Sequence, residues 1–138
     1  MTRTLAALAL LAALAACQDA GEHSVAMLRP GAGFTVARID GAPAPAGVTF
    51  EIGEGGRVTG RAPCNRYSGQ LTESDGAMTV SGTVMTRMAC AEADRMIAET
   101  RFGTALGSIT AARRTADGVG LIDPEGRERI GLTAAGGQ

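Results

Sequence analysis

The sequence predicts an α+β domain, in which short and mostly antiparallel strands form a curved, open-barrel-like sheet packed around one main helix. From residue 34 onward, short apolar segments alternate with turn residues at intervals of roughly ten residues. The apolar spacing becomes helical after residue 90 and returns to strand-like segments after residue 109. Many short strands beside a single helix are typical of an α+β fold.

The first residues predict export from the cytoplasm. Arg3 precedes an unbroken apolar run from Leu5 to Ala16, which is shorter than the about 20 residues that a membrane-spanning helix needs. The run ends in LAAC, which resembles the lipobox of bacterial lipoproteins, where the signal peptide is cleaved before a cysteine that receives lipid. We therefore expect residues 1–16 to be a signal peptide and Cys17 to be the lipidation site. An ordinary signal peptide with an incidental cysteine is the alternative.

The residue after Cys17 indicates in which bacterial membrane the lipid anchor lies. Gln18 stands where an aspartate would resemble an inner-membrane retention signal. By analogy we expect a protein that is lipid-anchored in the outer membrane and faces the periplasm. The membrane is thus one expected partner, through Cys17, and an envelope protein or a small ligand is another.

The rest of the chain predicts one domain with flexible ends. Residues 17–33 have the composition of a flexible tether, residues 34–134 form the domain, and residues 135–138 are expected to be a disordered tail. The 13 basic and 14 acidic residues argue against a nucleic-acid partner, which needs a basic stripe. We expect a monomer without a cofactor.

The first half of the domain predicts strands that are joined by tight turns. Residues 34–39 form a strand that ends at the Asp40-Gly41 turn. Residues 42–47 are predicted to be a loop, because Pro43 and Pro45 cannot donate to a strand ladder. Residues 48–52 alternate as a half-buried strand does. Further strand segments are expected at 57–63, 67–73, 77–82 and 83–88, with a turn at 74–76.

A helix is predicted from Ala91 to Ile109. Its apolar stripe consists of Ala91, Ala98, Phe102, Ala105, Leu106 and Ile109. Acidic residues in its first turn interact favourably with the helix dipole, and Gly107 can end the helix. Strand segments at 109–115, 119–123 and 127–132 complete the domain. With few aromatic residues in the chain, Met78, Met85 and Met88 are expected to fill the core.

Two short motifs resemble one known family. The first motif contains Cys64, Asn65, Tyr67 and Gly69, and the second contains Thr86, Arg87 and Cys90. In this order, before a helix and final strands, they resemble the META domain of HslJ-like bacterial lipoproteins over residues 34–132. Pro63 departs from the family, which usually has glycine there. The resemblance implies a curved sheet around a helix, a link to heat shock and envelope stress, and no enzymatic reaction.

The two remaining cysteines predict a disulfide. If Cys17 carries lipid, then Cys64 and Cys90 are an even pair in an oxidising compartment. A bridge between them would contribute about 3–4 kcal/mol of stability in the chain-entropy model. A thiol–disulfide switch is the alternative.

Catalytic constellations are weak in this sequence. The only histidine, His23, lies in the expected tether. A nucleophile in the domain therefore lacks a histidine base, and a zinc site lacks enough ligands. We therefore expect no enzymatic activity. One weaker alternative stays open, a hydrolase in which carboxylates such as Asp117 and Asp123 converge.

Asn65, Arg66, Tyr67 and Arg87 form the candidate binding patch beside the cysteines. Arginine donors and an aromatic face suit a partner or a ligand. The same residues also suit a structural role in a tight turn. The resulting functional expectation is a non-enzymatic envelope lipoprotein that acts as a binding or structural module. The alternative is a redox-responsive or small-ligand-binding periplasmic protein that uses the Cys64/Cys90 region.

Overall fold

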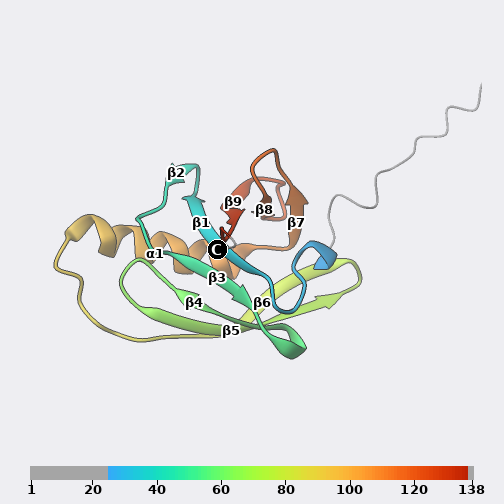
Figure 1. Ribbon diagram of the computed structural model, residues 1–138, viewed down its shortest axis with the longest axis horizontal. Helices are drawn as coiled ribbons and strands as arrows, with labels where there is room; N and C mark the ends of the chain where they lie inside the picture. Colours follow the sequence, from blue (N-terminus) through green and yellow to red (C-terminus); the bar gives the residue numbers. More distant parts are fainter. Residues whose placement is uncertain (1–24, 137–138) are drawn as a thin grey trace, which may run out of the picture.

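The computed structural model describes residues 25–136 (Figure 1). In this part of the chain, nine strands and one α-helix follow the predicted order, and the predicted fold class is confirmed. The elements are η1 (Val25–Met27), β1 (Gly33–Ile39), β2 (Ala42–Pro43), β3 (Thr49–Ile52), η2 (Glu54–Gly56), β4 (Arg57–Arg61), β5 (Arg66–Ser74), β6 (Ala77–Met85), α1 (Ala93–Ser108), β7 (Ala111–Arg114), β8 (Val119–Ile122) and β9 (Glu128–Ala134).

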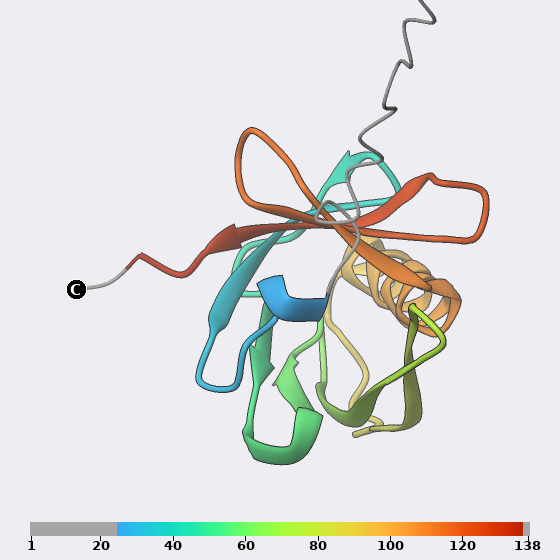
Figure 2. The ribbon, with the colours of Figure 1, turned by 90° about the vertical axis from the view of Figure 1, so that its right-hand side faces the viewer.

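The strands form one antiparallel sheet that curls towards a barrel. Its order is β6-β5-β4-β3-β1-β9-β8-β7, and β2 pairs with β1 alone. The two outer strands approach each other, because the N–H of Met78 in β6 donates to the carbonyl of Thr110 just before β7, at 2.8 Å. Figure 2 shows α1 nearly end-on beside this curved sheet. The helix contacts β1, β6 and β9 and so covers the open side.

Glycine-containing turns set the register of two hairpins. Asp40 and Gly41 have φ values of 50° and 77°, and Asp75 and Gly76 have 52° and 77°. Two successive left-handed residues are typical of the hairpin turns that Asp-Gly favours. The predicted segments 77–82 and 83–88 form a single strand, β6, which ends at Met85. Its pairing with β5 shifts between Ser68 and Gln70, so a bulge rather than a turn separates the two segments.

The predicted loop at residues 42–47 and the predicted bounds of the helix were wrong. Pro43 pairs with Arg38 in the short β1–β2 hairpin, because an edge strand needs only the proline carbonyl and not a donor. The helix starts at Ala93 rather than Ala91 and continues through Gly107 to Ser108. Ala91 therefore lies outside the helix and is exposed.

The packed domain begins earlier than residue 34. Leu28 is only 3% exposed and belongs to the core, and the N–H of Gly31 donates to the carbonyl of Ile52 at 2.7 Å. The part of the expected tether from residue 25 onward is therefore folded. At the other end, the N–H of Ala135 donates to Gly33. The signal peptide, Cys17 and His23 lie outside the described residues.

The core lies between the sheet and α1. Phe102, Ala105 and Leu106 of the helix are buried, as predicted. The ring of Tyr67 meets Phe102 edge-on, with centroids 5.1 Å apart and an interplanar angle of 67°. Met78 is buried and Met85 packs against the core, but Met88 is 68% exposed, so its predicted core position was wrong. Met88 comes after the last residue of β6 and leaves the sheet.

No helix within residues 25–136 combines the length and the apolar character that crossing a bilayer requires.

Candidate functional site

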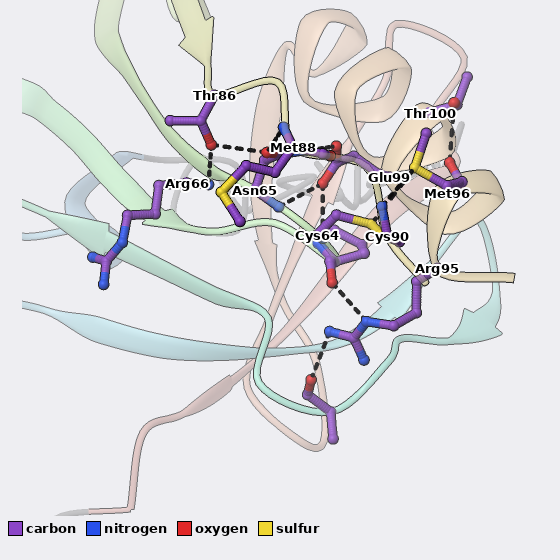
Figure 3. The surroundings of a disulfide bond; sticks show 12 residues. Cys64, Asn65, Arg66, Thr86, Met88, Cys90, Arg95, Met96, Glu99 and Thr100 are labelled. Atoms are coloured by element: carbon purple, nitrogen blue, oxygen red, sulfur yellow. Dashed lines mark hydrogen bonds between the residues drawn. A yellow bond between two sulfur atoms is a disulfide. The ribbon is translucent and has the colours of Figure 1, made fainter. Parts of the chain in front are cut away.

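The structure joins Cys64 and Cys90 by a disulfide (Figure 3). Their Cα atoms are 5.6 Å apart, and 26 positions separate them in the sequence. Cys64 lies in the four-residue turn Ala62–Asn65 between β4 and β5, which the N–H of Ala62 closes by donating to the carbonyl of Asn65 at 2.7 Å. Cys90 lies in the irregular segment between β6 and α1. The bridge therefore ties this segment to the hairpin turn.

The side chain of Asn65 holds the same two segments together. Its Oδ1 accepts hydrogen bonds from the hydroxyl of Thr86 at 2.9 Å and from the N–H of Met88 at 2.7 Å. Its Nδ2 donates to the carbonyl of Met88 at 3.1 Å and to Oε1 of Glu99. An asparagine side chain can make four such bonds, and all four are formed here. Figure 3 shows Asn65 between the Thr86–Met88 segment and Glu99 on the helix.

Two charged residues of α1 bind the backbone of the turn. Oε2 of Glu99 accepts the N–H groups of Cys64 at 2.7 Å and of Asn65 at 2.8 Å. Nε of Arg95 donates to the carbonyl of Pro63 at 2.8 Å, and its Nη2 donates to the carbonyl of Ala46 at 3.4 Å. The first half of the helix therefore satisfies both donors and acceptors of the turn, which its own hairpin cannot do.

Neither Arg95 nor Glu99 was found from the sequence. They lie four residues apart, and Glu99 precedes Phe102 by three, so both continue the helix face that carries the buried stripe. The position of these two charged residues on the same face as the apolar stripe was the signal that could have predicted their inward-facing polar contacts.

The candidate binding patch is divided by the structure. Asn65 and Tyr67 are only 5% and 4% exposed, so these two residues fit the structural alternative and do not present a polar and aromatic surface. Successive residues of a strand point to opposite faces, and β5 turns Tyr67 inward and Arg66 outward. Arg87 is exposed in the segment after β6. The two arginines are the members of the patch that stay on the surface.

Tyr67 is fixed on both sides. Its hydroxyl donates to the carbonyl of Thr49 at 2.9 Å. A Cβ on Gly60 would lie 2.2 Å from the same carbonyl oxygen and 2.9 Å from the tyrosine ring, so only glycine fits there. Burial, with a smaller contribution from the negative charge of Glu51, raises the pKa of the Tyr67 hydroxyl far above its usual value.

A hollow of about 360 Å³ adjoins the disulfide. Three arginines from three elements line it, namely Arg61 of β4, Arg66 of β5 and Arg95 of α1, and we call it the arginine hollow. Pro63, Cys64 and Met88 contribute to its wall. None of its lining residues is acidic, so the arginine hollow has a positive surface.

Asp117 and Asp123 do not converge as a hydrolase would require. They lie at opposite ends of the β7–β8 hairpin, because Asp117 is in its turn and Asp123 follows β8. Asp117 pairs with Arg38 at 3.7 Å, whereas Asp123 pairs with Arg127 at 2.8 Å. Burial raises the pKa of Asp123, but hydrogen bonds from the backbone and guanidinium of Arg127 outweigh it, and the net pKa is lowered. The described residues contain no group of three or more His, Cys, Asp and Glu side chains that could hold a metal ion.

Two structures solved by NMR share this fold. One is 24% identical and covers 76% of this chain and 89% of the other, with a TM-score of 0.57. The second, a protein from Burkholderia xenovorans, is 20% identical and covers 80% of this chain and 86% of the other, with a TM-score of 0.60. No curated protein matches the sequence. The family model of the META domain matches residues 26–135, which is most of the chain. The chain therefore belongs to the META domain family.

Proposed function

We propose that this chain is a non-enzymatic lipoprotein of the bacterial outer membrane, whose META domain faces the periplasm and acts as a binding or structural module that supports the envelope under stress. One observation carries the proposal. A disulfide joins Cys64 and Cys90 in a domain that follows a lipobox-like LAAC sequence. Stable disulfides form in oxidising compartments such as the periplasm, so the bridge and the export signal favour the same cellular compartment.

The proposed anchor keeps the domain near the membrane. Cys17 lies eleven positions before Leu28, which is buried in the core. Even a fully extended chain of this length spans at most about 40 Å. Two or more acyl chains on one residue are enough for stable attachment. A partner or ligand of the domain is thus sought at or near the periplasmic membrane surface.

Fractionation and complementation test this proposal together. We expect the wild-type protein in the outer-membrane fraction and the Cys17→Ser variant outside it, with the same folded domain by circular dichroism. A deletion strain should lose survival under heat or envelope stress, and wild type should restore it better than Cys17→Ser. Equal fractionation of both variants contradicts the anchor. Full rescue by an unanchored variant contradicts its role in function.

The disulfide region supports a second candidate, a redox-responsive protein. Cys64 and Cys90 are half-buried rather than enclosed. Two exposed methionines flank them, because Met88 is 68% and Met96 42% exposed, and Sδ of Met96 lies 3.9 Å from Sγ of Cys64. Thiol trapping in cells distinguishes the candidates. A bridge that stays oxidised in all conditions favours a structural disulfide, and one that opens under reductive stress and re-forms under oxidising conditions favours the switch.

A further inference from the structure

Two arginines face each other at the end of the β4–β5 hairpin. Arg61 and Arg66 are directly paired across the two strands, and both are exposed. Like charges at directly opposed positions destabilise an antiparallel pair. Within residues 25–136, neither guanidinium makes a hydrogen bond or an ion pair. The contacts of the two residues to Thr49 and Thr86 are made by their backbone groups: each N–H donates to a threonine hydroxyl, and the carbonyl of Arg66 accepts the N–H of Thr86.

Three arginines at the β8–β9 side of the domain are neutralised. Arg38 pairs with Glu128 at 2.9 Å, Arg129 with Asp40 at 2.5 Å, and Arg127 with Asp123 at 2.8 Å. The domain thus supplies carboxylates to arginines at the β8–β9 side of the sheet. It supplies none within ion-pair distance to Arg61 and Arg66, so their positions are not explained by pairing inside the described chain.

A third positive charge is held in place beside them. The guanidinium of Arg95 is fixed by the carbonyls of Pro63 and Ala46, which orient it without cancelling its charge. Figure 3 shows Arg66 and Arg95 on either side of Cys64. The disulfide and the bonds of Asn65 and Glu99 to the turn fix the backbone between them. A ligand would therefore meet a surface that is already ordered, which lowers the entropic cost of binding.

The nearest acidic side chains leave the arginine hollow positive. The carboxylate of Glu99 accepts the N–H groups of the turn and does not line the hollow. Glu51 lines an adjoining hollow together with Arg61 and Arg66, and it forms no ion pair with either of them.

We propose that the arginine hollow binds a phosphate group. Guanidinium groups match the oxygens of phosphate and carboxylate groups through paired hydrogen bonds. A carboxylate has only two oxygens, which a single arginine can serve, whereas a phosphate offers enough oxygens for three arginines that approach from β4, β5 and α1. The volume of about 360 Å³ suits the phosphate and a few neighbouring atoms. The phosphate can belong to a small soluble molecule or to a phospholipid headgroup.

This inference deepens the proposed function, because it rests on the domain being a binding module and names its ligand class. The two fail separately. A protein without lipid at Cys17 would contradict the proposed membrane location but not phosphate binding. A correctly anchored protein that binds no phosphate would contradict the proposed ligand but not the location.

Calorimetric titration of the full chain, purified from membranes in a non-ionic detergent, tests the inference. The probes are inorganic phosphate, glycerol 3-phosphate, and phosphatidylglycerol or phosphatidylcholine added to the same micelles. The variants are Arg61→Gln and Arg66→Gln. The matched control is Arg57→Gln, which removes the same charge from an exposed position of β4 outside the hollow. Circular dichroism checks that each variant is folded.

We expect binding that each hollow variant weakens by about tenfold or more, the usual effect of losing one charge-assisted pair, and that Arg57→Gln leaves nearly unchanged. Binding of glycerol 3-phosphate supports a soluble ligand, and binding of phosphatidylglycerol micelles alone supports a headgroup. An equal loss in Arg57→Gln would show general charge attraction and overturn the site. Absence of binding to every phosphate probe overturns it as well.

Discussion

Glu99 in the middle of α1 and Asn65 in the β4–β5 turn are joined twice, because the carboxylate accepts both the backbone N–H of Asn65 at 2.8 Å and its side-chain amide. This relationship connects the helix to the hairpin that carries Cys64. It also explains why an asparagine follows that cysteine. Its amide contacts the helix on one side and its carbonyl contacts the Thr86–Met88 segment on the other.

Glu99→Gln should destabilise the domain. The amide replaces one acceptor oxygen by a donor that then faces donors of the turn, and loss of a hydrogen bond to a charged group costs about 1.5–3 kcal/mol. Urea unfolding with the disulfide intact measures the free energy of unfolding. Glu73→Gln, at an exposed position of β5, is the matched control and should stay within about 0.5 kcal/mol of wild type. Equal stability of the two variants would contradict the role of Glu99.

Removal of the disulfide should cost a comparable amount. The double variant Cys64→Ser/Cys90→Ser loses the constraint on the unfolded chain, which corresponds to about 3–4 kcal/mol for a loop of this length. The unfolding free energy of the variant should match that of reduced wild type. The hydrogen bonds of Asn65 and Glu99 do not depend on the sulfur atoms, so the variant should remain folded in dilute buffer. An unchanged unfolding free energy would show that the bridge does not stabilise the domain.

Tyr67 makes stability fall at alkaline pH. Its folded-state pKa is raised by burial, whereas the unfolded chain loses the proton near the ordinary value of about 10. The resulting stability is fully present below about pH 10 and is lost as the pH rises above it. Because Tyr67 is the only tyrosine, tyrosinate absorbance should appear together with loss of the circular dichroism signal.

Tyr67→Phe is the control for this alkaline effect. It removes the titrating group, so its stability should depend less on pH in the same range, after a loss of about 1 kcal/mol for the hydrogen bond to Thr49. Tyrosinate that forms near pH 10 in a protein with an intact circular dichroism spectrum would contradict burial of this hydroxyl.

Asp123 makes stability fall in acid. Burial raises the pKa of Asp123, but the hydrogen bonds from Arg127 lower it by a larger amount. The folded-state pKa therefore lies below the unfolded one. The stability that this carboxylate contributes is present above about pH 4, near the unfolded value, and is lost as the pH falls through the lower folded value.

Asp123→Asn tests this acid dependence. We expect it to be less stable than wild type at neutral pH and to lose less stability on acidification. Asp75→Asn is the control, because Asp75 lies in an exposed turn with a left-handed φ of 52° that asparagine also adopts. Urea midpoints at several pH values give the comparison. Parallel curves for wild type and Asp123→Asn would show that Asp123 does not titrate as proposed.

The sequence predicted the features that depend on neighbouring residues. The alternation around Phe50, the Asp-Gly turns and the helical stripe at Phe102 are local patterns, and the structure contains them. The pairing of distant residues was harder to predict. Leu28 ends a four-residue apolar run, Val25–Leu28, that is too short to show a periodicity, so no pattern marked its place in the core.

Polar residues of the site were the least predictable part. An asparagine or tyrosine beside a cysteine suits either a surface or a buried turn, and only the position of α1 decides that Asn65 and Tyr67 point inward. Glu99 looked like an ordinary exposed helix residue, because its partners are backbone N–H groups 35 and 34 positions away. The opposition of Arg61 and Arg66 depends on the hairpin register, which the sequence left open.

Peptide mapping by mass spectrometry tests the central claim most directly. The protein would be extracted from membranes with free thiols blocked and digested without reduction. We expect an N-terminal peptide that begins at a lipid-modified Cys17 and a cross-linked pair of peptides that contains Cys64 and Cys90. An unmodified Cys17, or Cys64 and Cys90 recovered as separately blocked thiols, would contradict a lipid-anchored and disulfide-stabilised envelope protein.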